Sequence, residues 1–81
     1  MKRITLSKLK PGMESVITGL LAKGGMRRRL QDLGFVEGSH VDCVGISPLG
    51  NPTAYRISGT IIALRSEDAN QILIQEVETD V

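Results

Sequence analysis

Glycine and proline residues divide this chain into short segments along its whole length. The sequence has nine glycines and three prolines among 81 residues, and the runs between them are rich in Val, Ile, Leu and Thr. Such runs between turn residues are typical of a small β-barrel and not of βαβ units. Pro11-Gly12, for example, fits the centre of a type II turn. We therefore predict a mostly β fold of five or six strands, formed by a single domain over residues 1–81.

Five runs carry the clearest strand signals, and they cover residues 14–21, 41–46, 54–58, 60–64 and 72–77. In the first run, the alternation of a strand would place Ile17 and Leu21 on one face. In the second run, the apolar positions change phase between Cys43 and Val44, which predicts a β-bulge or a bend between two sheets. Gly59 is expected to form a corner or bulge between the third and fourth runs.

One α-helix is predicted, at about residues 26–33. Met26, Leu30 and Leu33 recur at helical spacing and would form one apolar stripe. Gly34 stands where a left-handed residue ends a helix, and Phe35 would fold back onto Leu30 as in a Schellman motif.

A single helical turn is expected before the last strand, with Ser66 as its N-cap. Glu67 and Asp68 would favour the positive end of that turn. The core must come mainly from Val, Ile and Leu, because the chain has only two aromatic residues and no Trp. Five or six strands with one short helix are the inventory of a small SH3-like β-barrel.

Four motifs are spread over nearly the whole chain. They are Leu9-Lys10-Pro11-Gly12, Arg29-Leu30-Gln31-Asp32-Leu33-Gly34-Phe35 followed by Gly38, Ser47-Pro48-Leu49-Gly50-Asn51-Pro52, and Gly59 with Ala63-Leu64-Arg65, Ala69 and Ile72. In this order and spacing they resemble the FeoA-like proteins, the small cytoplasmic ferrous iron transport protein A of bacterial iron uptake. Glu37 stands where that family often has Pro, and Asn51 where Asp is common, which affects only local loop contacts.

The resemblance implies an SH3-like barrel that acts with a large membrane ferrous-iron permease whose cytoplasmic part carries a GTPase domain. We predict a small adaptor or regulator of ferrous iron uptake that works by protein-protein interaction. The alternative is an SH3-like module associated with a metal-dependent transcriptional regulator or with nucleic acid. The adaptor is favoured, because the chain has no winged-helix half and its net charge of +1 argues against a dedicated nucleic-acid binder.

The sequence points to a cytoplasmic protein. The single Cys43 can form no internal disulfide, and the basic N-terminus lacks the apolar region and cleavage site of a signal peptide. The longest largely apolar stretch, residues 16–22, is far shorter than the ~20 residues that cross a bilayer. We expect contact with the membrane only through the partner, and the sequence leaves a homo-oligomer open.

We expect no enzymatic activity and assign no catalytic residue. The lone His40 has no acidic orienter, and no paired carboxylates sit in an apolar setting. On a strand, His40 and Cys43 would point to opposite faces, and a tetrahedral metal site needs about four ligands. Glu76, Glu78 and Asp80 are expected to form a solvated acidic tail. We therefore predict no tightly bound metal and no cofactor.

Two segments are predicted to contact the partner. Arg27, Arg28 and Arg29 are the densest basic feature and would lie on the solvent side of the helix, where Arg28 and Asp32 can pair one turn apart. The other interpretations are a solvated face and an arginine delivered to nucleotide phosphates. The second segment is the loop of Pro48, Leu49, Gly50, Asn51 and Pro52. Lys23-Gly24-Gly25 lacks the P-loop spacing, so a flexible turn is expected there.

Overall fold

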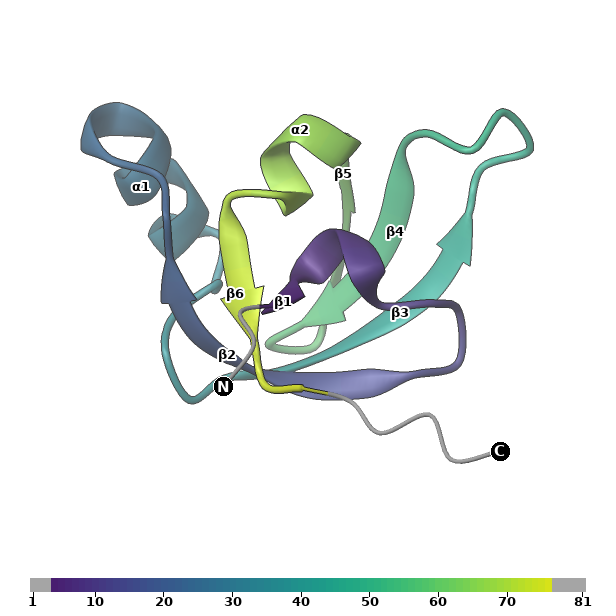
Figure 1. Cartoon of the computed structure of the whole chain (residues 1–81), viewed down its shortest axis with the longest axis horizontal. Helices are drawn as coiled ribbons and strands as arrows, with labels where there is room; N and C mark the ends of the chain where they lie inside the picture. Colours follow the sequence, from purple (N-terminus) through teal and green to yellow (C-terminus); the bar gives the residue numbers. More distant parts are fainter. Residues whose placement is uncertain (1–3, 77–81) are drawn as a thin grey trace.

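The structure, a computed structural model, describes residues 4–76, which form six strands and three short helical segments (Figure 1). The strands are β1 (Ile4–Thr5), β2 (Glu14–Leu20), β3 (His40–Ile46), β4 (Thr53–Ile57), β5 (Thr60–Leu64) and β6 (Ile72–Ile74). The helical segments are the 3₁₀ helix η1 (Leu6–Lys8) and the α-helices α1 (Gly24–Asp32) and α2 (Ser66–Ala69). The predicted mostly β fold with a short α-helix is confirmed.

The bounds of some elements differ from the prediction. α1 begins at Gly24, so the segment Lys23-Gly24-Gly25 is not a separate turn before the helix: Lys23 is the N-cap, and the two glycines are the first residues of α1, Gly24 with a φ of 63°. β6 ends at Ile74, and Val77 lies outside the described residues. The turn at Pro11-Gly12 is confirmed, because the N–H of Met13 donates to the carbonyl oxygen of Lys10 at 2.9 Å and Gly12 has a φ of 88°.

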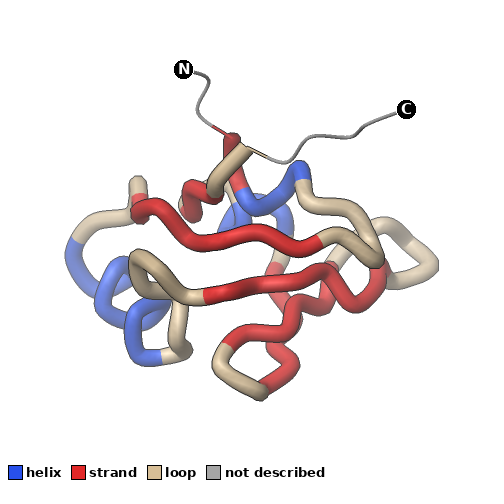
Figure 2. Tube along the Cα trace, turned by 90° about the horizontal axis from the view of Figure 1, so that it is seen from below, coloured by secondary structure: helices blue, strands red, loops and turns tan. Residues whose placement is uncertain are grey.

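All six strands belong to one antiparallel sheet in the order β1-β6-β2-β3-β4-β5. β2 pairs with β3 through residues 14–16 and with β6 through residues 17–20. Because the two halves of β2 have different neighbours, the sheet curls around an interior that η1 and α2 help to close (Figures 1 and 2).

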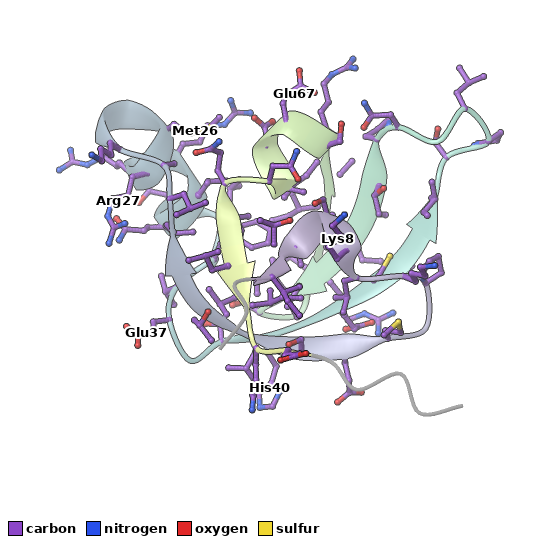
Figure 3. All side chains as sticks on the ribbon, viewed as in Figure 1. Lys8, Met26, Arg27, Glu37, His40 and Glu67 are labelled. Atoms are coloured by element: carbon purple, nitrogen blue, oxygen red, sulfur yellow. The ribbon has the colours of Figure 1, made fainter. Side chains whose placement is uncertain are left out.

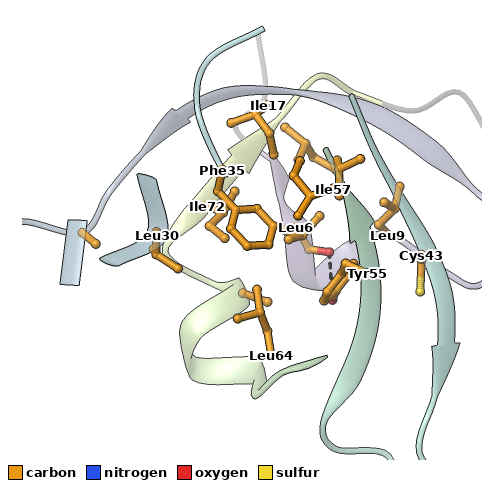
Figure 4. Packing of buried hydrophobic residues seen from close by; sticks show 14 residues of the cluster. Leu6, Leu9, Ile17, Leu30, Phe35, Cys43, Tyr55, Ile57, Leu64 and Ile72 are labelled. Atoms are coloured by element: carbon orange, nitrogen blue, oxygen red, sulfur yellow. Dashed lines mark hydrogen bonds between the residues drawn. The ribbon is translucent and has the colours of Figure 1, made fainter. Parts of the chain in front are cut away.

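One cluster of buried apolar side chains fills the interior (Figure 4). Its members are Leu6, Leu9, Ile17, Ala22, Leu30, Phe35, Val41, Cys43, Tyr55, Ile57, Leu64, Ala69, Ile72 and Ile74. Both aromatic residues belong to it, since Phe35 is 0% and Tyr55 2% exposed. The Tyr55 hydroxyl donates a hydrogen bond of 3.4 Å to the carbonyl oxygen of Leu6, which satisfies its polar atom inside the core.

The predicted bulge in β3 is present. Cys43 faces Tyr55 and Gly45 faces Ala54 across the β3–β4 pair, so Val44 is the extra residue. The bulge leaves Val44 exposed while Cys43 stays in the core.

A second register shift, in β2, was not predicted. Ile17 faces Ile74 and Gly19 faces Leu73, so Thr18 is the extra residue. Ile17 is buried, whereas Leu21 lies beyond the end of the strand and is exposed. The prediction that Ile17 and Leu21 share a face is therefore wrong, because the shift changes the phase between them.

β4 and β5 form a tight hairpin. Ile57 faces Thr60, so only Ser58 and Gly59 connect the two strands. Both have positive φ, 51° and 77°, as in the type I′ turn that matches the twist of a two-residue hairpin. The predicted corner or bulge at Gly59 is therefore wrong, and Ser58 belongs to the turn instead of β4.

The end of α1 is the predicted Schellman motif. The N–H of Phe35 donates to the carbonyl oxygen of Leu30, and that of Gly34 to Gln31, both at 3.0 Å. Gly34 has a φ of 110°. A Cβ at this position would lie 2.9 Å from the Oγ of Ser58, so the end of α1 fits closely against the β4–β5 turn.

We predict that Gly34→Ala lowers the free energy of unfolding by at least about 1–2 kcal/mol, the cost of a left-handed backbone for a residue with a Cβ. The contact with Ser58 adds to this cost. Gly25→Ala is the matched control: a Cβ there meets nothing within 4 Å, and helix propensity favours Ala. Urea unfolding followed by circular dichroism measures both variants. Equal stability of the two variants would contradict the prediction.

Candidate partner-binding surfaces

α1 presents the three arginines at positions 27–29 on a helix that is anchored to the core. Leu30 is 1% exposed, and Met26 and Leu33 pack half-buried against the core cluster. The arginines are all exposed, so the predicted inner stripe and outer basic face of the helix are confirmed. The basic face is therefore attached to a helix fixed at its C-terminal end by the Schellman motif.

The three arginine side chains are not held alike. Arg27 donates from Nη1 to the carbonyl oxygen of Leu20 at 3.3 Å, and Figure 3 shows it on the outer side of α1. The predicted pair of Arg28 and Asp32 does not form. Within residues 4–76 the ion pair is that of Arg56 with Asp42, at 3.2 Å. No ion pair within this part of the chain therefore neutralises the guanidinium groups of α1.

The loop between β3 and β4 is braced by its own hydrogen bonds. The N–H of Ser47 donates to the carbonyl oxygen of Pro52 at 3.1 Å, and the N–H of Gly50 donates to the carbonyl oxygen of Ser47 at 2.8 Å. The Ser47 hydroxyl donates to the carbonyl oxygen of Asn51 at 3.0 Å and accepts from the N–H of Leu49 at 3.3 Å. Leu49 is 93% exposed. The loop thus holds a large apolar side chain in water.

Asn51 fastens this loop to α2. Its Oδ1 accepts the backbone N–H of Ser66, the first residue of α2, at 3.0 Å. Arg65 occupies the N-cap position and makes no side-chain cap bond, so the prediction that Ser66 caps the turn is wrong. The capping oxygen comes instead from a residue in the candidate partner-binding loop.

We predict that Asn51→Ala lowers the free energy of unfolding by about 1 kcal/mol, the usual cost of losing a helix cap. It should also speed hydrogen exchange at the amide of Ser66. Asn51→Asp is the control, because it keeps the acceptor oxygen and places a negative charge where a helix N-terminus favours it. Exchange at Ser66 that is equally fast in both variants would show that Asn51 does not cap α2.

The two predicted segments do not form one surface. Figure 1, drawn with the longest axis horizontal, shows α1 at one end of the molecule and the β3–β4 loop at the other. The extents of the fold along its principal axes are 38, 32 and 22 Å. The arginines and the loop are therefore two separate candidate surfaces.

His40 and Cys43 lie on opposite sides of β3, as predicted. His40 is exposed on the outside of the barrel (Figure 3), and Cys43 is 2% exposed in the core. Residues 4–76 contain no group of three or more His, Cys, Asp or Glu side chains that could hold a metal ion. Of the predicted acidic tail, Glu76 is exposed, and Glu78 and Asp80 lie outside the described residues.

Sequence reasoning missed two surface features. One is a shallow depression of about 360 Å³, lined by Gly38, Ser39, His40, Asp42, Arg56, Ser58 and Gly59. The other is the exposure of several large apolar side chains, among them Ile46 at 48% and Ile61 at 58%. The exposure of Ile61 was missed because the apolar residues of β5 do not alternate with polar ones. The depression was missed because Asp42 and Arg56 come together only in the register that the bulge in β3 sets.

The two ionisable groups of the core have raised pKa values. Burial raises the pKa of the Cys43 thiol above its ordinary value of 9.0; a backbone hydrogen bond at Gly45 opposes this, and the charge of Asp42 adds to it. Burial also raises the pKa of Tyr55 above 10.0, with Cys43 adding to the effect. Both groups bind their protons more tightly in the folded state than in the unfolded state.

We predict that these groups stabilise the fold fully below about pH 9 and that their contribution falls as the pH rises, first through Cys43 and then through Tyr55. Urea unfolding between pH 8 and 10.5 measures the decline. Cys43→Ala removes the part of this decline that begins near pH 9. The free energy of unfolding of the variant should therefore fall less over this range than that of the parent. An identical decline in both proteins would contradict the prediction.

Comparison with known proteins decides the family. A family model described as the FeoA domain matches residues 4–76. The chain belongs to the FeoA family. No helix within those residues is long and apolar enough to span a bilayer.

One relative joins two proteins in a single chain. It is the Fe(2+) transport protein A/Fe(2+) transporter FeoB fusion protein of Porphyromonas gingivalis, which is 35% identical over 75 residues. The match covers 93% of the FeoA-family chain described here, which spans only 9% of the length of that relative.

Solved structures confirm the SH3-like fold. An FeoA-like protein from Clostridium acetobutylicum has a TM-score of 0.87 and 27% identity, over 100% of this chain and 94% of that one. Stenotrophomonas maltophilia FeoA, described as an SH3 domain protein and crystallised with zinc, has a TM-score of 0.79 and 32% identity, over 89% of each chain. A manganese-dependent transcriptional repressor, with a TM-score of 0.79 and 16% identity, covers 93% of this chain and 42% of its own. At that identity the repressor shares the fold alone.

Proposed function

We propose that this FeoA-family chain is a single-domain cytoplasmic adaptor of ferrous iron uptake, which binds the cytoplasmic, GTPase-containing region of a membrane ferrous-iron permease. The Porphyromonas gingivalis fusion carries the proposal, because a segment 35% identical to this chain shares one polypeptide with FeoB. A covalent link keeps two modules at high effective concentration. A separate chain has to reach the same partner through its own binding surface.

The basic face of α1 is the favoured binding surface. Interface energy is concentrated in Trp, Tyr and Arg anchors, and here there is no Trp, while Tyr55 is buried. Arginine is thus the anchor type left on the surface. Because Leu30 and the Schellman motif fix α1, the arginines dock with a smaller loss of backbone entropy than they would from a flexible loop.

The β3–β4 loop is the second proposed binding surface. Leu49 is 93% exposed, and the hydrogen bonds of Ser47 and Asn51 hold it in place before any partner arrives. An apolar side chain on a backbone held in this way lowers the free energy of the complex when it enters an apolar pocket. Since α1 and the loop lie at opposite ends of the fold, variants at each can be tested separately.

The regulator or nucleic-acid alternative has no observation of its own, since the repressor shares only the fold. A titration with generic duplex at low salt tests it. Binding by contacts to phosphates would weaken with salt, with a log–log slope of about −0.9 per contact. The adaptor proposal expects no saturable binding at micromolar concentrations.

We predict that Arg27→Glu with Arg28→Glu weakens binding to the permease's cytoplasmic region at least tenfold, which corresponds to about 1.4 kcal/mol. The loss should grow as the salt concentration falls, because screening weakens. Stability should change little, since exposed charges contribute little to it. Calorimetry and circular dichroism measure the two effects.

Lys8→Glu with Lys10→Glu is the matched control, because both lysines are exposed and the net charge changes equally. This control should keep most of the affinity. A similar loss of affinity in both double variants would mean that the net charge of the chain, and not the position of the arginines on α1, determines binding. A folded α1 variant that binds like the parent at low salt would remove α1 from the interface, and Leu49→Ser would then test the loop.

A further inference from the structure

β5 leaves one edge of the sheet without a partner strand. It is the last strand in the order and pairs only with β4. Ile57 and Thr60 flank a two-residue turn and so form a hydrogen-bonded pair. The alternation along the hairpin then directs the backbone groups of Ile61 and Ala63 away from β4. Among the turn, loop and cap hydrogen bonds of the described residues, none involves the backbone groups of Ile61 or Ala63.

The exposed edge has none of the usual protection against strand addition. The strand Thr60-Ile61-Ile62-Ala63-Leu64 carries no charge and no proline, and its register with β4 has no bulge. Ile61 is 58% exposed. An exposed apolar edge without charge, proline or bulge readily accepts another strand.

A shallow apolar groove adjoins this edge on the outer face of the sheet. Ala63 faces Ala54, and Ala54 faces Gly45, so three small residues lie side by side across β5, β4 and β3. They line a groove of about 340 Å³ together with Ile46, Ser47 and Pro52. None of these residues is charged, so the groove suits an apolar side chain.

We propose that β5 pairs with β5 of a second copy of this chain, to give a twofold-symmetric dimer with one continuous sheet. When the twofold axis passes through Ile62, Ile61 of each copy faces Ala63 of the other. Both residues direct their backbone groups outward, so each of these pairs can exchange both of its N–H···O=C bonds. The register thus follows from the spacing of Ile61 and Ala63 about Ile62.

The side chains of the two copies are complementary in this register. The large Ile61 of one copy lies opposite the small Ala63 of the other, at the mouth of its groove. The nearest charge on β4, that of Arg56, is bonded at 3.2 Å to Asp42, on the side away from the edge. Arg65 would face Gly59 of the second copy, so no like charges oppose each other.

A second copy is the favoured occupant because the edge complements itself. Ile61 and Ala63 supply both the hydrogen-bond donors and the acceptors. Ile61 also provides the large side chain of each pair, and Ala63 the small one. A twofold contact also closes, since each copy has a single free β5 edge and both are used. The dimer therefore removes the exposed edge without starting a fibre.

Sedimentation of the full chain alone tests the proposal. We expect a concentration-dependent dimer, and we expect Ile61→Lys to raise its dissociation constant at least tenfold. Val44→Lys is the matched control, because it places the same charge at an exposed apolar position of β3 that neither the edge nor the groove includes. Circular dichroism checks that both variants fold.

Hydrogen exchange gives a second readout. The amides of Ile61 and Ala63 should be protected in the dimer and should exchange rapidly in Ile61→Lys. A chain that stays monomeric at millimolar concentration with rapid exchange at both amides overturns the proposal, and so does a dimer that survives Ile61→Lys. Protection of these amides only after the permease region is added would also overturn it, in favour of an extended segment of that partner. No permease is needed for the main test, so its failure leaves the adaptor proposal standing.

Discussion

The curl of the sheet at β2 is the constraint on which the rest of the fold depends. A chain of 81 residues buries only a modest part of its apolar surface. A sheet that curls back on itself lets both of its halves share one core. β2 achieves this because its first residues pair with β3 and its last with β6. The bulges at Thr18 and Val44 bend the strands there, so that Phe35 and Tyr55 meet in one core.

Enclosing the core in this way leaves rigid elements on the outside. α1 is anchored through Leu30, and the β3–β4 loop is held by Ser47 and by the bond from Ser66 to Asn51. Neither element has to fold when a partner binds, so little conformational entropy is lost. The proposed docking of a chain with few aromatic residues would benefit from this, because the backbone that carries its arginines and Leu49 is already held in place.

Much of the local chemistry was predictable from the sequence, although the two-residue turn at Ser58-Gly59 was missed. Pairing over long separations was not predictable. The turn at Pro11-Gly12, the Schellman end at Gly34 and the bulge after Cys43 each depend on neighbouring residues. The bond from Ser66 to Asn51 spans 15 positions and the Arg56–Asp42 contact 14. Both require a register that the sequence alone does not specify. The arginines of α1 could be placed on a solvent face, but their distance from the loop required the tertiary fold.

Different forces act at the surfaces that this fold leaves open. The proposed docking through α1 would rely on guanidinium charges, so salt would weaken it by screening. Pairing through β5 relies on backbone hydrogen bonds and on burial of Ile61, which salt screens little. Ionic strength would therefore separate the two proposed interactions: at high salt the β5 contact should persist, while the affinity of α1 for the permease region should fall. Because β5 and α1 use no residue in common, a dimer would present two basic helices to that partner, and its binding would gain from bivalency.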